Sequence, residues 1–133
     1  MMTGAEINLW AVFLAGIVSV GIGAIWYSQS VFGKVWMKLS GNQACKNMTR
    51  SYIIGFLASL VMAYIFASFI FFMGVNTAAA GAAAGFWIWL GFFATTGLGI
   101  VLWENKPFKL YLINTIYSLV SLVVMGIILA NWI

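Results

Sequence analysis

The sequence predicts an all-α integral membrane protein: a four-helix transmembrane bundle with a short interfacial helix after the first span. Of its 133 residues, 65% are hydrophobic and only 6% are charged. A soluble domain has about a quarter of its residues charged, and a chain this short with so few charges could not cover its apolar surface in water. We therefore expect one transmembrane domain over residues 1–133.

The positions of the charges predict the number of spans. The eight charged side chains form three groups, which are Glu6, then Lys34, Lys38, Lys46 and Arg50, and finally Glu104, Lys106 and Lys109. The uncharged stretches between these groups cover residues 7–33, 51–103 and 110–133. Because one span needs about 20 apolar residues, the middle stretch holds two spans and the others hold one each.

The middle stretch divides near Gly74, where a glycine is followed by small polar residues and Thr77 can cap the next helix. The predicted spans cover residues 7–27, 52–73, 79–103 and 110–130. The loops over residues 28–51 and 104–109 carry four and two basic side chains, whereas the other loop and both ends carry none. By the positive-inside rule, both basic loops are cytoplasmic and both termini lie outside, so copies of the chain should be parallel.

The segment after the first span has the pattern of a short amphipathic helix. Apolar residues from Val31 to Leu39 share one helical face, and Lys34 and Lys38 share another. We expect this helix to lie in the cytoplasmic interface, either as a simple anchor or as a gate or docking element. The expected anchor residues are Trp26, Tyr27, Ser28, Phe32, Gly33, Lys34, Trp36 and Lys38.

Small residues recur at every fourth position on several spans. In lipid this spacing lets helix backbones approach closely. The expected helix-packing positions are Gly55, Ser59 and Ala63 on the second span, and Gly81, Gly85, Gly91, Thr95 and Gly99 on the third. Gly81 and Gly85 can receive a helix of the same chain or the same segment of another copy.

The last span carries a polar stripe at helical spacing, formed by Asn114, Tyr117, Ser118 and Ser121. Polar groups in hydrocarbon need partners, so the stripe should face another helix or a wet cavity. The candidate partners are Tyr64, Ser68, Thr95 and Thr96. The stripe then either bonds neighbouring helices or lines a path for water or a small solute.

The second basic loop contains a possible ion pair. Glu104 is the only acid predicted on the cytoplasmic side, and Lys106 and Lys109 lie close to it in sequence. Pro107 cannot continue the third span and suits the opening turn of the fourth. Such a pair at a wet interface contributes little to stability.

The chain is nearly empty of catalytic residue types. It has no His, one Cys and no charged residue inside a predicted span. We therefore expect no enzyme activity, no cofactor and no metal site, and no acid for proton-coupled transport. The net charge of +4 lies in the loops, where it favours anionic lipid headgroups as partners and gives no platform for nucleic acid.

Several segments together resemble one known family. They are Trp26-Tyr27-Ser28, Phe32-Gly33-Lys34, Trp36-Met37, residues 85–92, residues 110–114 and Tyr117. They are similar to the small four-span bacterial membrane family known as domain of unknown function 1761. The resemblance implies a bacterial inner-membrane protein with no known cofactor and no established activity.

Two functions fit these features. The first is a non-catalytic helical bundle that associates with itself or serves as a small accessory subunit of a membrane complex. The second is a parallel homo-oligomeric channel or facilitator for a small neutral solute or an ion, lined by the polar stripe of the last span.

Overall fold

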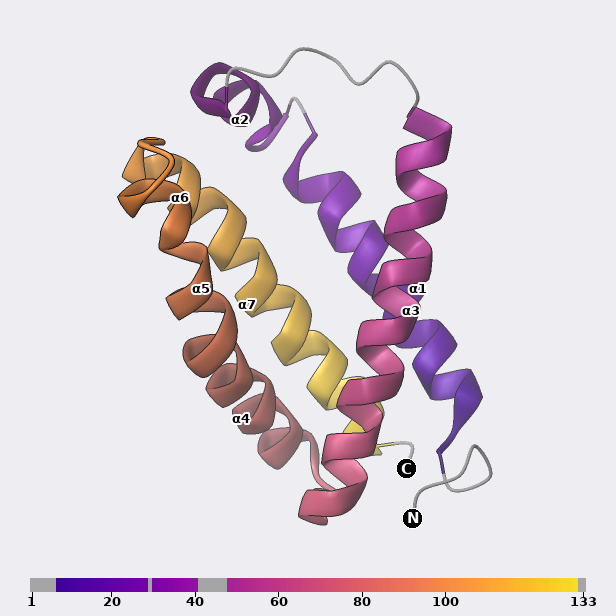
Figure 1. The fold of residues 1–133 in the computed structure, drawn as a ribbon. Helices are drawn as coiled ribbons and strands as arrows, with labels where there is room; N and C mark the ends of the chain where they lie inside the picture. Colours follow the sequence, from indigo (N-terminus) through magenta and orange to yellow (C-terminus); the bar gives the residue numbers. More distant parts are fainter. Residues whose placement is uncertain (1–6, 29, 41–47, 132–133) are drawn as a thin grey trace.

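The computed structural model describes residues 7–28, 30–40 and 48–131, and within these ranges the regular structure is helical (Figure 1). Four helices are long and apolar enough to cross a membrane, at Leu9–Trp26, Thr49–Met73, Ala78–Leu102 and Phe108–Asn131. The predicted fold class is confirmed, including a short helix after the first span. Glu6 and Lys46 lie outside the described residues.

The third span differs from the single regular helix that the sequence predicted. The elements are α1 (Leu9–Trp26), α2 (Gly33–Ser40), α3 (Met48–Met73), α4 (Ala78–Ile88), the π-helix η2 (Trp89–Ala94), α5 (Thr95–Gly97), α6 (Gly99–Leu102) and α7 (Phe108–Asn131). The third span therefore consists of α4, η2, α5 and α6 in succession.

The turn between α3 and α4 forms where the sequence predicted it. Gly74 has a φ of +69°, a left-handed conformation that glycine adopts without steric cost. The Val75 N–H donates to the Ile70 carbonyl, which closes the end of α3 in a Schellman motif. The Thr77 hydroxyl accepts from the Ala80 N–H at 3.2 Å and caps α4.

The last helix, α7, is the centre of the bundle. It packs against α1 on one side and against α4 on the other, and α3 packs mainly on α1 (Figure 1). We call the end where α2 and α6 lie the α2 end, and the end where α1 begins and α7 finishes the terminal end. Although α3 and α4 are consecutive, they pack on different partners.

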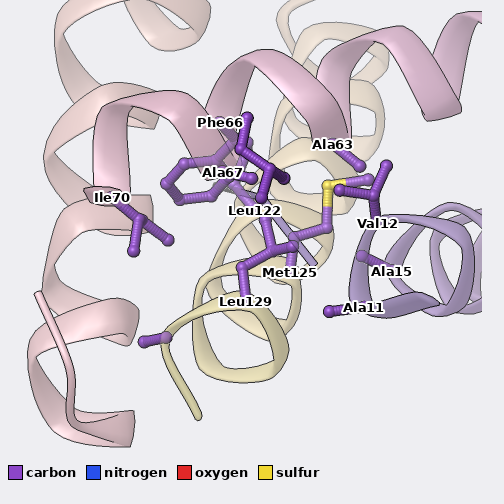
Figure 2. Close-up of a cluster of buried hydrophobic side chains, with 12 residues drawn as sticks. Ala11, Val12, Ala15, Ala63, Phe66, Ala67, Ile70, Leu122, Met125 and Leu129 are labelled. Atoms are coloured by element: carbon purple, nitrogen blue, oxygen red, sulfur yellow. The ribbon is translucent and has the colours of Figure 1, made fainter. Parts of the chain in front are cut away.

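The buried apolar core lies toward the terminal end, where α1, α3 and α7 meet (Figure 2). Its members are Ile7, Ala11, Val12, Ala15, Ala63, Phe66, Ala67, Ile70, Leu122, Met125, Leu129 and Ala130. Alanines on α1 and α3 let these helices approach each other, and Met125 and Leu129 fill the space between them. In the described part of α3 the buried side chains begin at Ala63, so the half of α3 near the α2 end is outside this core.

The contact between α4 and α7 is made by glycine backbones. A Cβ added to Gly81 would lie well under 3.0 Å from the carbonyl oxygen of Gly126, and a Cβ on Gly126 would meet the Gly81 carbonyl equally closely. A Cβ on Gly85 would meet the Leu122 carbonyl oxygen in the same way. The structure thus places Gly81 and Gly85 against α7 of the same chain, and Gly126 of α7 lies directly against Gly81.

We predict that Gly126→Ala destabilises the bundle, because the added methyl must push two backbones apart. Overpacking of this kind costs about 1–3 kcal/mol. Gly55→Ala is the matched control, because a Cβ there has no neighbour within 4 Å among the described residues. Thermal unfolding in detergent, followed by circular dichroism, should show a lower midpoint for Gly126→Ala only. Equal midpoints for the two variants would contradict the close contact.

Candidate functional site

The predicted polar stripe of α7 faces α1. The Tyr27 hydroxyl donates to Asn114 Oδ1 at 2.7 Å, and the Tyr117 hydroxyl donates to the Ser19 carbonyl oxygen at 2.9 Å. The Ser19 and Ser121 hydroxyl oxygens lie 2.6 Å apart and share a hydrogen bond. These bonds join α1 to α7 over about two helical turns.

The predicted partners of the stripe are wrong for Ser68 and Thr95. The hydroxyls of Ser68, Thr95 and Thr96 each donate to the backbone carbonyl oxygen four residues earlier in the same span. These carbonyls belong to Tyr64, Gly91 and Phe92, respectively. A hydroxyl in a helix can satisfy itself in this way without a neighbouring helix. Ser118 does the same within α7, donating to the Asn114 carbonyl at 3.3 Å.

Residues on the opposite side of α7 form hydrogen bonds with both ends of the π-helix η2. Trp89 Nε1 donates to the Thr115 carbonyl oxygen at 2.7 Å and approaches the Thr115 hydroxyl at 3.2 Å. The Tyr111 hydroxyl donates to the Ala94 carbonyl oxygen at 2.6 Å. Trp89 and Ala94 are the first and last residues of η2. The π-helix therefore inserts one residue between two positions that both contact α7.

Sequence reasoning missed Trp89, Tyr111 and Thr115 as site residues. A signal was present, because an indole N–H in the middle of a span has no water to bond and needs an acceptor on another helix. Residues 89–94 are apolar or small like the rest of the span and include no proline or charged residue, so nothing in the composition indicated a π-helix there.

The expected anchor residues fix the turn between α1 and α2 onto α7. Trp26 Nε1 donates to the Ile113 carbonyl oxygen at 3.0 Å, and the Phe32 ring lies 4.8 Å from the Trp26 ring. The Tyr27 ring packs edge-on against Trp36. Interfacial aromatic residues thus connect the short helix to the bundle instead of serving only as contacts with lipid headgroups.

Gly33 is required by the same turn. A Cβ at Gly33 would lie well under 3.0 Å from the Tyr27 and Ser28 carbonyl oxygens, and the Gly33 N–H donates to the Ser28 carbonyl at 2.8 Å. The Ser28 hydroxyl donates to the Ile25 carbonyl oxygen at 2.7 Å. Lys34 is exposed on α2, as is Lys38, so both charges face outward from the turn.

The remaining predicted packing positions have different surroundings. Ala63 is buried in the core, whereas Gly55 and Ser59 line a hollow of about 240 Å³ together with Tyr27 and Tyr117. Gly91 and Thr95 are exposed, and Gly99 has Trp103 of its own span 3.8 Å from an added Cβ.

A polar hollow of about 280 Å³ lies between α7 and the segment α5–α6. Thr96, Asn114, Thr115 and Ser118 line it together with aromatic side chains. The structure thus brings two members of the predicted stripe to one cavity with Thr96.

The second basic loop is a tight turn at the α2 end. Asn105 has a φ of 56°, and the Lys106 N–H donates to the Ile100 carbonyl oxygen at 2.9 Å. Glu104, Lys106 and Lys109 are exposed there, and an ion pair of Glu104 with either lysine stays a prediction. Within residues 7–28, 30–40 and 48–131, no group of three or more His, Cys, Asp or Glu side chains could hold a metal ion.

The family model described as "Protein of unknown function (DUF1761)" matches residues 10–130. The chain belongs to this family. The DUF1761 match takes in the anchor turn, the π-helix and the polar stripe, so the resemblance noted in the sequence is confirmed. No curated protein and no solved structure matches the chain.

We predict that the Tyr27–Asn114 hydrogen bond contributes measurably to stability. Tyr27→Phe removes the hydroxyl and keeps the ring contact with Trp36, and Asn114→Ala removes the acceptor. A double-mutant cycle on these two changes should give a coupling of about 0.6 kcal/mol, the average for hydrogen bonds between membrane helices. Unfolding in mixed micelles measures it, with Tyr52→Phe on exposed α3 surface as control. A coupling of zero would mean that the bond adds nothing beyond packing.

Proposed function

We propose that the chain is a non-catalytic multi-pass membrane protein that acts by association through its third span. The partner is a second copy in parallel orientation or a larger membrane complex in which the chain is a small accessory subunit. One observation carries the proposal: Gly91 and Thr95, which are four residues apart on the third span, are exposed on a surface that the described part of the chain leaves uncovered, whereas Gly99 is half-buried beside Trp103.

The third span has two sets of small residues, and they differ in whether another helix of the chain covers them. Gly81 and Gly85 are buried against the backbone of α7. A Cβ on Gly91 has no neighbour within 4 Å among the described residues, and Thr95 is exposed. Since small residues at four-residue spacing allow another helix to approach closely, the second set suits a helix from a different chain.

The third span is also the least covered of the four. Only 11% of its most apolar 18-residue window is buried, compared with 39% for the last span. A helix that packs on one neighbour keeps most of its circumference for lipid or for a partner. Association at this face needs no change in the packing of α4 on α7.

The proposal includes an orientation and a location. The loops over residues 28–51 and 104–109 carry all six Lys and Arg side chains of the chain, which favours a cytoplasmic position for both loops and an outer position for both termini. A fixed orientation makes any homo-oligomer parallel. The location proposed for the chain is the bacterial inner membrane.

A channel or facilitator has less support. It is favoured by the polar hollow beside α7, which is lined by Thr96, Asn114 and Ser118. Against it, the Asn114 side-chain oxygen Oδ1 accepts from the Tyr27 hydroxyl and the Tyr117 hydroxyl donates to the Ser19 carbonyl oxygen, so both groups hold helices together. Hydrogen-bonding groups that join helices are poor candidates for the lining of a pore.

We predict that vesicles containing the protein show the same water and glycerol permeability as protein-free vesicles, because the polar stripe is used for packing. Stopped-flow light scattering measures this directly. A higher permeability that falls in Asn114→Ala would support the channel and overturn the non-catalytic association proposal as the main function.

We predict that Gly91→Leu disrupts the native assembly and leaves the folded chain intact, because the added side chain enters open space on the monomer and blocks only an approaching helix. Gly21→Leu on α1 is the matched control, since a Cβ there also has no neighbour within 4 Å in the described part of the chain. Native mass spectrometry of gently extracted protein should show loss of the oligomer or complex for Gly91→Leu alone. An assembly that survives Gly91→Leu would count against this surface.

A further inference from the structure

Two hollows along α7 share Phe93 in their linings, and we call them together the furrow. The first is an apolar groove of about 410 Å³ between α3, α4 and η2, lined among others by Met62, Phe66, Ile88 and Leu122. The second is the polar hollow described above, and Phe93 lines both. On α7, Leu122 of the groove and Ser118 of the hollow are one helical turn apart, about 6 Å along the axis.

The chemistry of the furrow changes along its length in one direction. Its part toward the terminal end is lined by aliphatic and aromatic side chains. Its part toward the α2 end holds hydroxyl and amide groups and reaches Ile100, whose carbonyl oxygen accepts from the Lys106 N–H. Beyond it lies the end of the bundle that carries Lys34 and Lys38 on α2. The order is apolar, then polar, then cationic.

Asn114 provides a donor in the polar part. Its Oδ1 accepts from Tyr27 and its backbone carbonyl accepts from Ser118. Within residues 7–28, 30–40 and 48–131, the side-chain NH2 of Asn114 has no hydrogen-bond partner. An amide N–H at membrane depth is costly without an acceptor. Asn114 lines the hollow, so an acceptor supplied by a ligand there would satisfy it.

We propose that the furrow binds one anionic phospholipid from the leaflet at the α2 end. One acyl chain fills the apolar groove, an ester carbonyl oxygen accepts from the Asn114 NH2, and the phosphate lies at the level of the lysines. A water-sized group occupies about 30 Å³ of liquid, so the groove of about 410 Å³ has room for about fourteen such groups, which is comparable to most of one acyl chain. The positive charge at that end selects an anionic headgroup.

This site is separate from the proposed association surface. Gly91, Thr95 and Gly99 do not line the furrow, whereas Phe92 and Phe93 do. A lipid in the furrow and a helix on the small-residue stripe therefore occupy different faces of the third span. Each proposal can fail while the other holds.

The test uses the full chain in vesicles of equal amounts of phosphatidylcholine and phosphatidylglycerol, followed by native mass spectrometry. The wild-type chain should retain one phosphatidylglycerol in preference to phosphatidylcholine. Ile88→Trp, which fills the groove, should reduce retention about tenfold through steric clash. Ile116→Trp is the same change on an exposed part of α7 outside the furrow, and it should leave retention unchanged.

A second pair of variants tests the polar contact. Asn114→Ala and Tyr27→Phe both remove the bond between α1 and α7, and only Asn114→Ala removes the NH2 donor. Retention should fall about fivefold in Asn114→Ala, the effect of one hydrogen bond, and stay unchanged in Tyr27→Phe. Equal losses in the two variants would assign the effect to helix packing and overturn the proposal.

Photolabelling locates the bound lipid independently. A phosphatidylglycerol with a diazirine on its acyl chain should label peptides from residues 62–69 and 88–93. The proposal is overturned if the label spreads evenly over all exposed apolar faces, if Ile88→Trp and Ile116→Trp lose lipid equally, if neutral lipid is retained as well as anionic lipid, or if crosslinking shows a second copy of the chain in the groove.

Discussion

Hydrogen-bonding groups placed in hydrocarbon must find partners within the protein, and in this bundle α7 provides most of them. Ser19 of α1 and Tyr27, which caps the end of α1, bond to its stripe on one flank, and Trp89 at the start of η2 bonds to its other flank. Apolar contact alone gives little preference between helix and lipid. Directional bonds, together with glycine backbone contact, therefore determine which helices are neighbours, and they explain why α3 and α4 pack on different partners despite their short connection.

The surfaces of the third span show how one helix can serve several purposes. Its Gly81–Gly85 face is closed against α7, its outward stripe at Gly91 is open, and its edge at Phe93 borders the furrow. The π-helix, which contains Gly91 and Phe93, lets both α4 and the later turns keep contact with α7. A span of regular α-helix would lose one of the two bonds that hold η2, because the five-residue step from Trp89 to Ala94 does not fit a 3.6-residue turn.

The number of spans and the turn at Gly74 could be predicted because they depend on where charge, glycine and capping residues fall, and these are local properties. The polar stripe could be predicted as a face, but its partner could not, since helical spacing says which residues lie together and not which helix they meet. Gly126 could have been found, because Ala130 follows it at four-residue spacing. The π-helix left no trace in hydropathy, and the furrow depends on the angle between helices that are distant in sequence.

The position of α7 in the chain has a consequence for biogenesis. Membrane proteins are synthesised from the N-terminus, and α7 is the last of the four spans to leave the ribosome. Until it inserts, Ser19, Tyr27 and Trp89 have none of the acceptors or donors that they use in the finished bundle. These three residues can therefore make the bonds seen in the finished bundle only after α7 has inserted, so the arrangement of the earlier spans depends on the arrival of α7.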